Sequence, residues 1–262
     1  MKMKRVLTVS ILIVLLAGLA FSQRIRIGAT PVPHAQMLEA IKGLLKEKDI
    51  ELDIIVFNDY VLPNLALANG ELDANFFQHA PYLDVFISER GINNLKALKP
   101  VHVEPMGFYS RKTLTELQRG DTVVLPNDPT NEGRALLLLQ ENGLIRLRNA
   151  SDLKATVRDI VENPKGLRFK EVEAGFIPRV YSTDNSVQAA VINTNYAISA
   201  GLNPIKDAIF YEGENSPYAN MVVIDRKNQD KEWVTLLQAA LRSLAMKQFI
   251  EEKYNGAVVA VF

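Results

Sequence analysis

Short strand patterns alternate with amphipathic helix patterns along the first half of the chain, and this alternation limits the fold more than any other feature. The segments "RIRIGAT", "ELDIIVFN" and "LDANFF" indicate strands, the first by alternating polar and apolar residues. Between the first two lies "PHAQMLEAIKGLLKEKD", whose apolar residues share one helical face: Met37, Leu38, Ile41, Leu44 and Leu45. Helices between short strands predict a parallel sheet covered on both faces.

A second series of the same kind follows. It contains the strand pattern "TVVLP", a helix pattern from about Asn131 to Glu141, a late strand "ANMVVID" and the longest amphipathic pattern, "NQDKEWVTLLQAALRSLAMKQFIEEKYNG". Two series of similar size indicate two lobes. The chain is expected to cross between them near 103–108 and 216–220, where Pro105 and Pro217 interrupt strand patterns. In such folds ligands bind at strand ends and helix N-termini that face the gap.

The first 22 residues are typical of an export signal, because three basic residues precede an apolar run from Val6 to Phe21. Cleavage after Ser22 would leave Gln23 as the N-terminus, and an uncleaved anchor is the alternative. The chain contains no cysteine, and Leu19 stands where a lipoprotein signal requires one. We therefore expect an exported protein, periplasmic or associated with the cell envelope, that is not lipid-anchored through cysteine.

The charge balance and the missing motifs restrict the function. Beyond the signal, 240 residues carry 27 basic and 30 acidic side chains, a balance that disfavours nucleic acid as a partner. No nucleophile elbow, phosphate loop, dinucleotide fingerprint or zinc motif is present. The three histidines, at positions 34, 79 and 102, lack ligand spacing. We therefore expect no enzyme, no metal and no cofactor; an exported α/β hydrolase using Ser110, Ser182 or Tyr82 is the alternative.

Arg134, in "NDPTNEGRALLLL", is the clearest candidate for binding a ligand. It stands near the start of a predicted helix, where unpaired N–H groups already carry partial positive charge. A cation at that place indicates an anion nearby, either a ligand carboxylate or an acid such as Glu132 or Glu171. Thr130 and Asn131 are ordinary helix-cap residues by type.

Two amides and four rings complete the candidate set. Asn193 and Asn220 lie in apolar segments, where an unpaired amide costs roughly 1–3 kcal/mol, so each needs a ligand or a backbone partner at a turn. The rings lie near strand ends, where they can line a pocket or fill a core. They are Tyr60, Phe77, His79 and Tyr82.

Five segments resemble, in order, the methionine-binding components of bacterial ABC importers, the NlpA-type substrate-binding proteins. They are "FNDYVLPNLAL", "LDANFFQHAPYLD", "VVLPNDPTNEGRALLLLQENGLI", "AVINTNYA" and "SPYANMVV". The resemblance implies an α/β, two-lobed periplasmic-binding-protein type II fold, each lobe a mostly parallel sheet flanked by helices. It implies a signal peptide at 1–22, a first lobe at 23–105 and 219–262, and a second lobe at 106–218.

The resemblance also implies roles for individual residues. Arg134 would pair with the ligand carboxylate, and Asn193 and Asn220 would hold the carboxylate and amino groups. The side-chain pocket would be formed by Tyr60, Phe77, His79 and Tyr82, with Asn131 beside it. The implied function is extracytoplasmic binding of L-methionine and its delivery to an ABC permease with ATPase subunits. D-methionine, a methionine dipeptide and another apolar amino acid remain alternative ligands.

Overall fold

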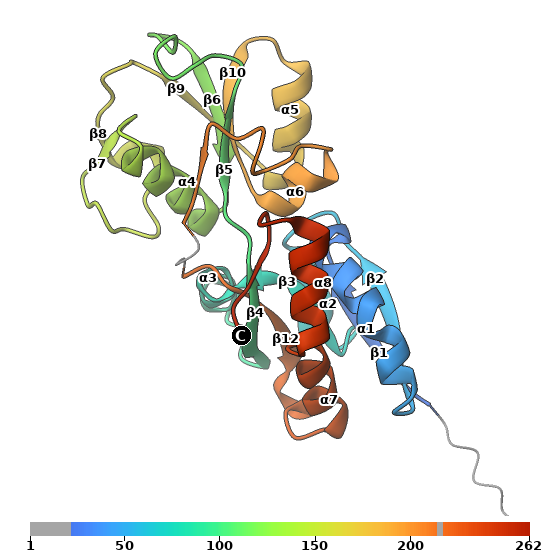
Figure 1. Cartoon of the computed structure of the whole chain (residues 1–262). Coiled ribbons are helices and arrows are strands. Elements are labelled where there is room, and N and C mark those ends of the chain that lie inside the picture. The colour runs from blue at the N-terminus through green and yellow to red at the C-terminus, as the bar shows by residue number, and fades with distance from the viewer. Residues whose placement is uncertain (1–21, 214–216) are drawn as a thin grey trace, which may run out of the picture.

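The computed structural model describes residues 22–213 and 217–262. The predicted signal peptide at 1–22 lies outside the described residues, apart from Ser22. Within the described ranges, no helix combines the length and the apolar character needed to cross a bilayer. The described chain forms two bodies, one above the other in Figure 1, each built on its own sheet.

The lower body is built on a six-stranded sheet with the order β13-β4-β12-β3-β1-β2. Its strands are β1 (Gln23–Ala29), β2 (Ile50–Val56), β3 (Ala74–His79), β4 (Leu95–Val103), β12 (Asn220–Asp225) and β13 (Val259–Ala260). Strand β1 runs parallel to β2 and β3, whereas β12 runs antiparallel to β3 and β4. The sheet therefore combines the N-terminal part of the chain with its C-terminal end.

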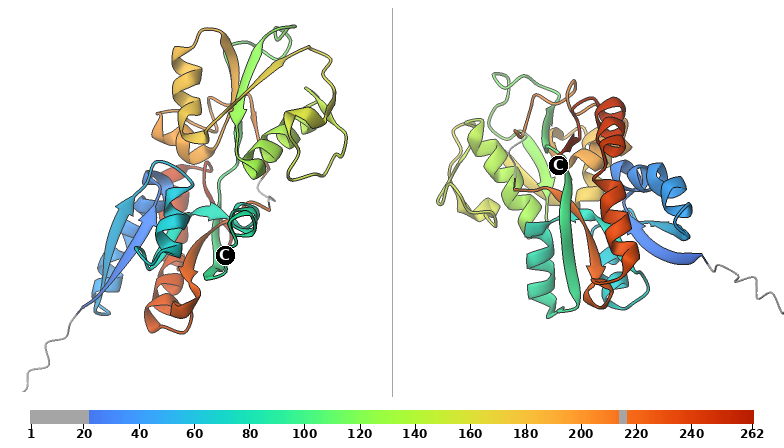
Figure 2. Two further views of the ribbon diagram at one scale, coloured as in Figure 1. Left: turned by 180° about the vertical axis from the view of Figure 1, so that it is seen from behind. Right: turned by 60° about the horizontal axis from the view of Figure 1, so that its bottom comes forward.

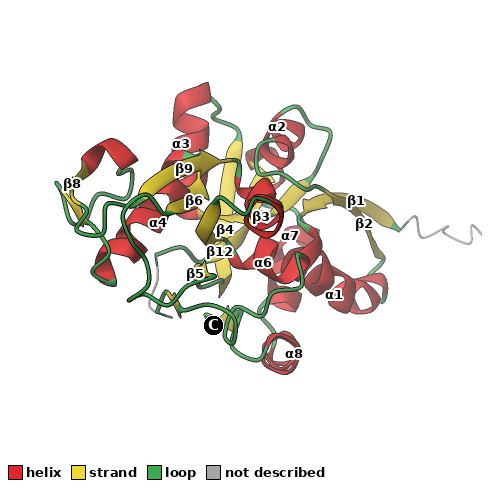
Figure 3. Ribbon diagram, turned by 90° about the horizontal axis from the view of Figure 1, so that it is seen from above, coloured by secondary structure: helices red, strands yellow, loops and turns green. Residues whose placement is uncertain are grey.

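Helices cover both faces of this sheet, as Figure 3 shows from above. On one face lie η1 (Pro31–Ala35), α1 (Gln36–Lys46), α7 (Glu232–Leu241) and α8 (Leu244–Tyr254), and on the other lie α2 (Leu62–Ala68) and α3 (Ala80–Arg90). Strand β12 serves both cores, because alternate side chains point to opposite faces. Val222 and Ile224 enter the core under α1, and Met221 and Val223 enter the core under α2.

The upper body is built on a five-stranded sheet with the order β11-β5-β10-β6-β9. Its strands are β5 (Gly107–Ser110), β6 (Thr122–Pro126), β9 (Arg168–Val172), β10 (Val187–Ile192) and β11 (Phe210–Tyr211). Helix α4 (Pro129–Glu141) packs on one face, and α5 (Ile177–Thr183) and α6 (Thr194–Ser199) pack on the other. Outside the sheet lie β7 (Arg146–Leu147), β8 (Ile160–Glu162) and the short turns η2 (Val157–Asp159) and η3 (Ala174–Phe176). A further turn in the lower body is η4 (Arg226–Asn228).

The chain passes between the two sheets twice, close to the predicted crossings. It leaves the lower sheet after Val103 and enters the upper sheet at Gly107, and it returns between β11 and β12. The left view of Figure 2 shows the two bodies with these connections between them. The lobe boundaries at 105/106 and 218/219 stay predictions.

Three local expectations differ from the structure. The sheets are mixed rather than mostly parallel, because the strands next to the crossings enter each sheet from the other body and not through a helical crossover. The long C-terminal helix is two helices, since Ser243 caps α8 by accepting from the Met246 N–H. Helix α4 begins at Pro129, two residues before the predicted start, with Asp128 as its cap.

Candidate functional site

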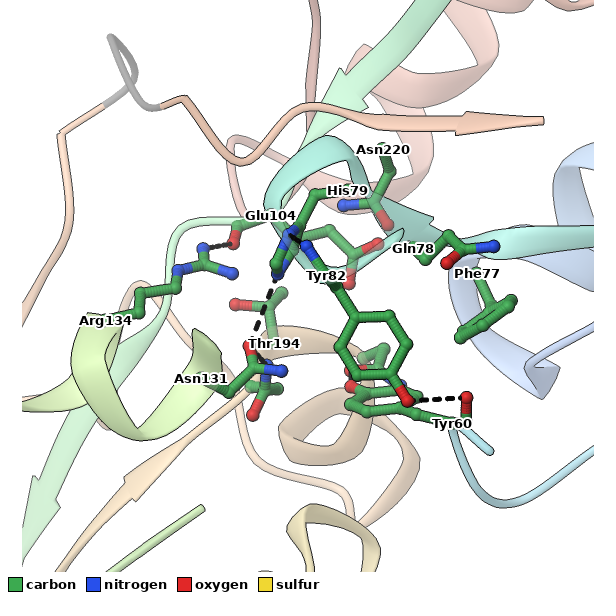
Figure 4. A pocket seen from close by; sticks show the side chains of 12 residues that line it. Tyr60, Phe77, Gln78, His79, Tyr82, Glu104, Asn131, Arg134, Thr194 and Asn220 are labelled. Carbon is green, nitrogen blue, oxygen red and sulfur yellow. Dashed lines mark hydrogen bonds between the residues drawn. The ribbon is translucent and has the colours of Figure 1, made fainter. Parts of the chain in front are cut away.

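A cavity lies between the two bodies, and all eight predicted ligand-binding residues line it (Figure 4). The space between its walls, counted together with its opening to solvent, is about 340 Å³. Four further residues line it that the sequence analysis did not propose: Gln78, Glu104, Thr194 and Asn195.

Arg134 projects from α4 into this cavity and is only 3% exposed. We expected Arg134 in the first helical turn, but α4 begins five residues earlier, at Pro129, so Arg134 lies beyond that turn. Its Nη2 donates to the backbone oxygen of Glu104 at 2.7 Å. Figure 4 shows the other terminal nitrogen directed toward the middle of the cavity, and no acceptor among the described residues bonds to Nη1. One side of the guanidinium is therefore available to an anion.

The other side of the Arg134 guanidinium is bound to Glu212. Nε and Nη2 donate to the two carboxylate oxygens of Glu212 at 2.7 and 2.5 Å. The alternative of an ion pair within the protein is therefore correct in part, but the acid is Glu212 and not Glu132 or Glu171. Glu132 accepts instead from the Val157 N–H. Burial acts to lower the pKa of Arg134, but the Glu212 carboxylate outweighs it and the pKa is raised. Arg134 remains a cation in the cavity wall.

Glu104 is the one carboxylate among the residues that line the cavity, and the sequence analysis missed it. It follows β4 directly, in the first crossing, and is 5% exposed. Its Oε1 accepts from Nε2 of His102 at 2.8 Å and lies 3.2 Å from Nε2 of His34. Burial raises the pKa of its carboxyl group. An acid between a buried strand and Pro105 is the sequence signal that could have identified it.

His34 and His102, scattered in the sequence, come together behind Glu104. Burial lowers the pKa of His34 to about 4 and that of His102 to about 3, so both rings are neutral. Nδ1 of His34 bonds to the Thr30 hydroxyl at 2.7 Å, and Nε2 faces two oxygen acceptors, Asn220 Oδ1 and Glu104 Oε1, so the tautomer with the proton on Nε2 fits these contacts.

With Glu104, these two rings form the one group of metal-type donors that the described residues contain, with ligand atoms within 4.8 Å of one another. Nδ1 of His102, however, is buried without the second hydrogen bond that orients a metal-ligating histidine. The contacts fit two neutral donors that hold one carboxylate.

Asn131 and Asn193 form an amide pair in the upper wall of the cavity. Asn131 is not a helix cap, because Asp128 has that role and accepts from the Asn131 backbone and side-chain N–H groups. The Asn131 Oδ1 accepts from Asn193 Nδ2 at 2.8 Å. The Asn193 Oδ1 is buried and has no hydrogen-bond partner among the described residues. A buried acceptor of this kind in a cavity wall is suited to a ligand N–H.

Asn220 and His79 belong to the lower wall, where β12 pairs with β3. The Asn220 Oδ1 lies 3.2 Å from Nε2 of His34, so Asn220 is linked to the ring that holds Glu104. His79 caps α3 by accepting from the Tyr82 N–H at 3.2 Å. Its Nε2 reaches Asn131 across the cavity at 3.4 Å. Burial, aided by the Arg134 charge, lowers the pKa of His79 to about 3, so this ring is a neutral donor.

Aromatic rings form the apolar end of the cavity. Tyr60 lies 5.9 Å from both Phe77 and Tyr82, measured between ring centres, and 5.0 Å from Tyr196. The Tyr82 hydroxyl donates to the Tyr60 backbone oxygen at 2.8 Å. These rings can surround an apolar or thioether side chain, while the charged groups lie at the other end.

The two bodies touch around the cavity through hydrogen bonds. Tyr60 donates to Asn195 Oδ1 at 2.7 Å, and Tyr196 donates to the backbone oxygen of Asn58 at 3.1 Å. Each bond joins the lower body to the start of α6 in the upper one. The two bodies are therefore in direct contact beside the cavity.

Comparison with known proteins agrees with this geometry. The family model of the NlpA lipoproteins matches residues 25–262. The chain belongs to the NlpA lipoprotein family. A relative named D-methionine-binding lipoprotein MetQ, from Escherichia coli strain K12, is 44% identical over 238 residues, which cover 90% of this chain and 87% of the relative. The expected family resemblance is confirmed.

Solved structures of related proteins confirm the α/β fold of the periplasmic binding proteins. A nutrient-binding protein from Burkholderia cenocepacia bound to methionine has a TM-score of 0.86 and 44% identity, with 91% of this chain and all of the other covered. A periplasmic substrate-binding protein of an ABC transporter from Coxiella burnetii has a TM-score of 0.84 and 40% identity, with coverages of 90% and 100%.

The comparisons contradict one expectation from the sequence. We expected a protein without a lipid anchor, whereas both the family and the Escherichia coli relative carry the name lipoprotein. The expectation rested on Leu19 and on the lack of cysteine, and the 262 residues do contain no cysteine. The expectation of a family without a lipid anchor is therefore wrong, because the lack of cysteine in one chain does not describe the other members of the family.

Proposed function

We propose that the protein is an extracytoplasmic solute-binding protein that binds methionine between its two lobes and delivers it to an ABC import permease. The observation that carries this proposal is the charge pattern of the cavity. Among its lining residues, Arg134 is the one guanidinium and Glu104 the one carboxylate. A zwitterionic amino acid supplies the complement of both, with its carboxylate at Arg134 and its ammonium at Glu104.

The amides add direction to this recognition. Asn193 Oδ1, which has no partner among the described residues, and the Asn220 side chain line the same cavity and would bond to the ammonium and carboxylate groups. The rings of Tyr60, Phe77 and Tyr82 would then enclose the side chain at the apolar end. This arrangement assigns six of the eight predicted residues to one ligand, with Glu104 added.

The interaction energies are sufficient for tight binding. Each charge-assisted contact contributes roughly 1.5–3 kcal/mol. Burial of the thioether chain adds roughly 1.5–3 kcal/mol, with a sulfur–aromatic contribution of about 0.3–1.5 kcal/mol. Because association and closure cost several kcal/mol, a micromolar or tighter affinity needs both the zwitterion contacts and the side-chain contacts.

Closure is the property that suits this site to delivery. The hydrogen bonds from Tyr60 and Tyr196 join the two bodies, so a ligand that contacts both would favour the closed arrangement. The closed form would be the one that the permease receives, and its ATPase subunits would supply the energy for import. The related ABC substrate-binding protein supports this role.

The zwitterion contacts are common to several ligands. L-methionine is the leading ligand, and the name of the Escherichia coli relative makes D-methionine the first alternative. A methionine dipeptide and another apolar amino acid are further alternatives. Family membership supports a non-catalytic role, and the serines considered as nucleophiles bond to backbone oxygens, Ser110 to Gln188 and Ser182 to Arg179.

Calorimetry tests the proposal directly. Purified protein, freed of any retained ligand by unfolding and refolding, would be titrated with L-methionine, D-methionine, a methionine dipeptide and leucine. We expect saturable binding of methionine at one site, tighter than that of leucine, and recovery of the ligand chemically unchanged after long incubation. No binding by any methionine compound, or consumption of the ligand, would reject the proposed function.

A further inference from the structure

Glu212 is a charged residue next to the cavity that has no proposed contact with the ligand. It follows β11 and its side chain is 11% exposed. It does not line the cavity, whereas its partner Arg134 does. Its carboxylate binds the edge of the guanidinium formed by Nε and Nη2. A ligand at the Nη1 side therefore has no need to displace it.

Arg134 is held in one orientation by its neighbours. Glu212 fixes one edge, the Glu104 backbone oxygen accepts from Nη2, and the ring of Tyr218 lies 4.4 Å from the guanidinium carbon. A planar guanidinium bound along an edge and covered on a face has little freedom to rotate. Its remaining nitrogen stays directed into the cavity.

Glu212 is itself fixed within the upper body. Its carboxylate accepts from the Met106 N–H at 2.9 Å, and its own N–H donates to the Met106 oxygen at 3.0 Å. Met106 directly precedes β5, so these contacts join the two segments by which the chain connects the sheets. Because Arg134 also belongs to the upper body, the three residues can stay together when the two bodies separate.

The need for such a clamp follows from the opposite charges of the cavity. Arg134 and Glu104 are its only cation and anion among the lining residues, and in a buried space they attract each other. If the Arg134 and Glu104 side chains formed an ion pair with each other, neither charge would be available to bind a zwitterionic ligand. In the structure, Oε1 of Glu104 instead lies 2.8 Å from Nε2 of the neutral His102 and 3.2 Å from Nε2 of the neutral His34, and Arg134 forms an ion pair with Glu212.

We propose that Glu212 is a positioning residue, which holds Arg134 away from the Glu104 carboxylate so that the two ends of a zwitterionic ligand can bridge the charges. The inference rests on the proposed function. It adds to that function an explanation of how two buried opposite charges stay available to bind a ligand. The gain for binding is preorganisation, since the guanidinium does not have to be freed and turned when the ligand arrives.

The test compares Glu212→Gln with the unaltered protein in calorimetry with two ligands, methionine and methioninol, which has a hydroxymethyl group in place of the carboxylate. We expect Glu212→Gln to weaken methionine binding at least tenfold and methioninol binding at most about twofold. Glu162→Gln is the matched control, because Glu162 pairs with Arg146 on the exposed surface of the same body. It should change neither affinity.

Thermal unfolding of each variant separates positioning from folding. Should Glu212→Gln fail to fold, Glu212→Asp keeps the charge but withdraws it from the guanidinium edge, and the same selective loss for methionine is expected. Equal losses for both ligands, or tighter binding of methionine, would overturn the inference. If the unaltered protein binds no methionine compound, the proposed function fails, and this inference fails with it.

Discussion

Replacing Glu104 by Gln isolates one charge of the cavity with almost no change of shape. Glu104 is 5% exposed and its Oε1 accepts from the neutral His102, so a Gln oxygen can keep that contact. What disappears is the negative charge proposed to meet the ligand ammonium. A buried hydrogen bond to a charged group contributes roughly 1.5–3 kcal/mol, so methionine affinity should fall roughly 10- to 150-fold.

The stability of the same variant should move in the opposite direction or not at all. Burial raises the pKa of Glu104, which means that the folded protein binds this proton more tightly than the unfolded chain. The ionised form therefore opposes folding at neutral pH, and a neutral amide removes that opposition. Glu104→Gln should unfold at the same temperature as the unaltered protein or at a higher one.

Calorimetry at several pH values completes the test. In the unaltered protein, Glu104 takes up a proton as the pH falls and loses its charge, so methionine binding should weaken on acidification. In Glu104→Gln this part of the pH dependence should be absent. Glu132→Gln is the control, because burial also raises the pKa of Glu132, to about 7, although it lies outside the cavity. Unchanged methionine affinity in Glu104→Gln would refute the assignment of the ammonium to this carboxylate.

Three further substitutions test closure, packing and acid sensitivity. Tyr196→Phe removes the hydroxyl that donates to Asn58, a contact between the bodies worth roughly 0.5–1.5 kcal/mol, so calorimetry should show methionine affinity about 2- to 10-fold weaker. Gly133→Ala should destabilise by roughly 1–3 kcal/mol in denaturant unfolding, although alanine favours helices, because the new carbon would lie 2.4 Å from the Leu153 oxygen. Burial lowers the pKa of His102 to about 3, so on acidification the unfolded chain takes up this proton before the folded protein does, and the free energy of unfolding falls below about pH 6.5. Between pH 7 and pH 5, His102→Gln should therefore lose roughly 2 kcal/mol less of its free energy of unfolding than the unaltered protein.

The sequence determined the local elements of this protein, because their signals lie within a few residues of one another. The pattern "RIRIGAT" corresponds to β1, and Gly91 ends α3 in the left-handed conformation that glycine favours. The family resemblance also identified eight residues that the fold brings to one cavity. The break between α7 and α8 was missed, since the apolar pattern continues through Ser243.

Which charged groups meet depends on how the two bodies fold together. Arg134 pairs with Glu212, 78 positions away, and not with the nearby acids. The reason is that the N-terminal part of α4 lies next to the segment that follows β11. His34 reaches Asn220 across 186 positions and shares Glu104 with His102. Such pairs depend on strand order and on the two crossings, and no local pattern encodes them. The sequence therefore specified the residues that line the cavity, whereas the packing of two bodies placed one cation and one anion apart in the same buried space.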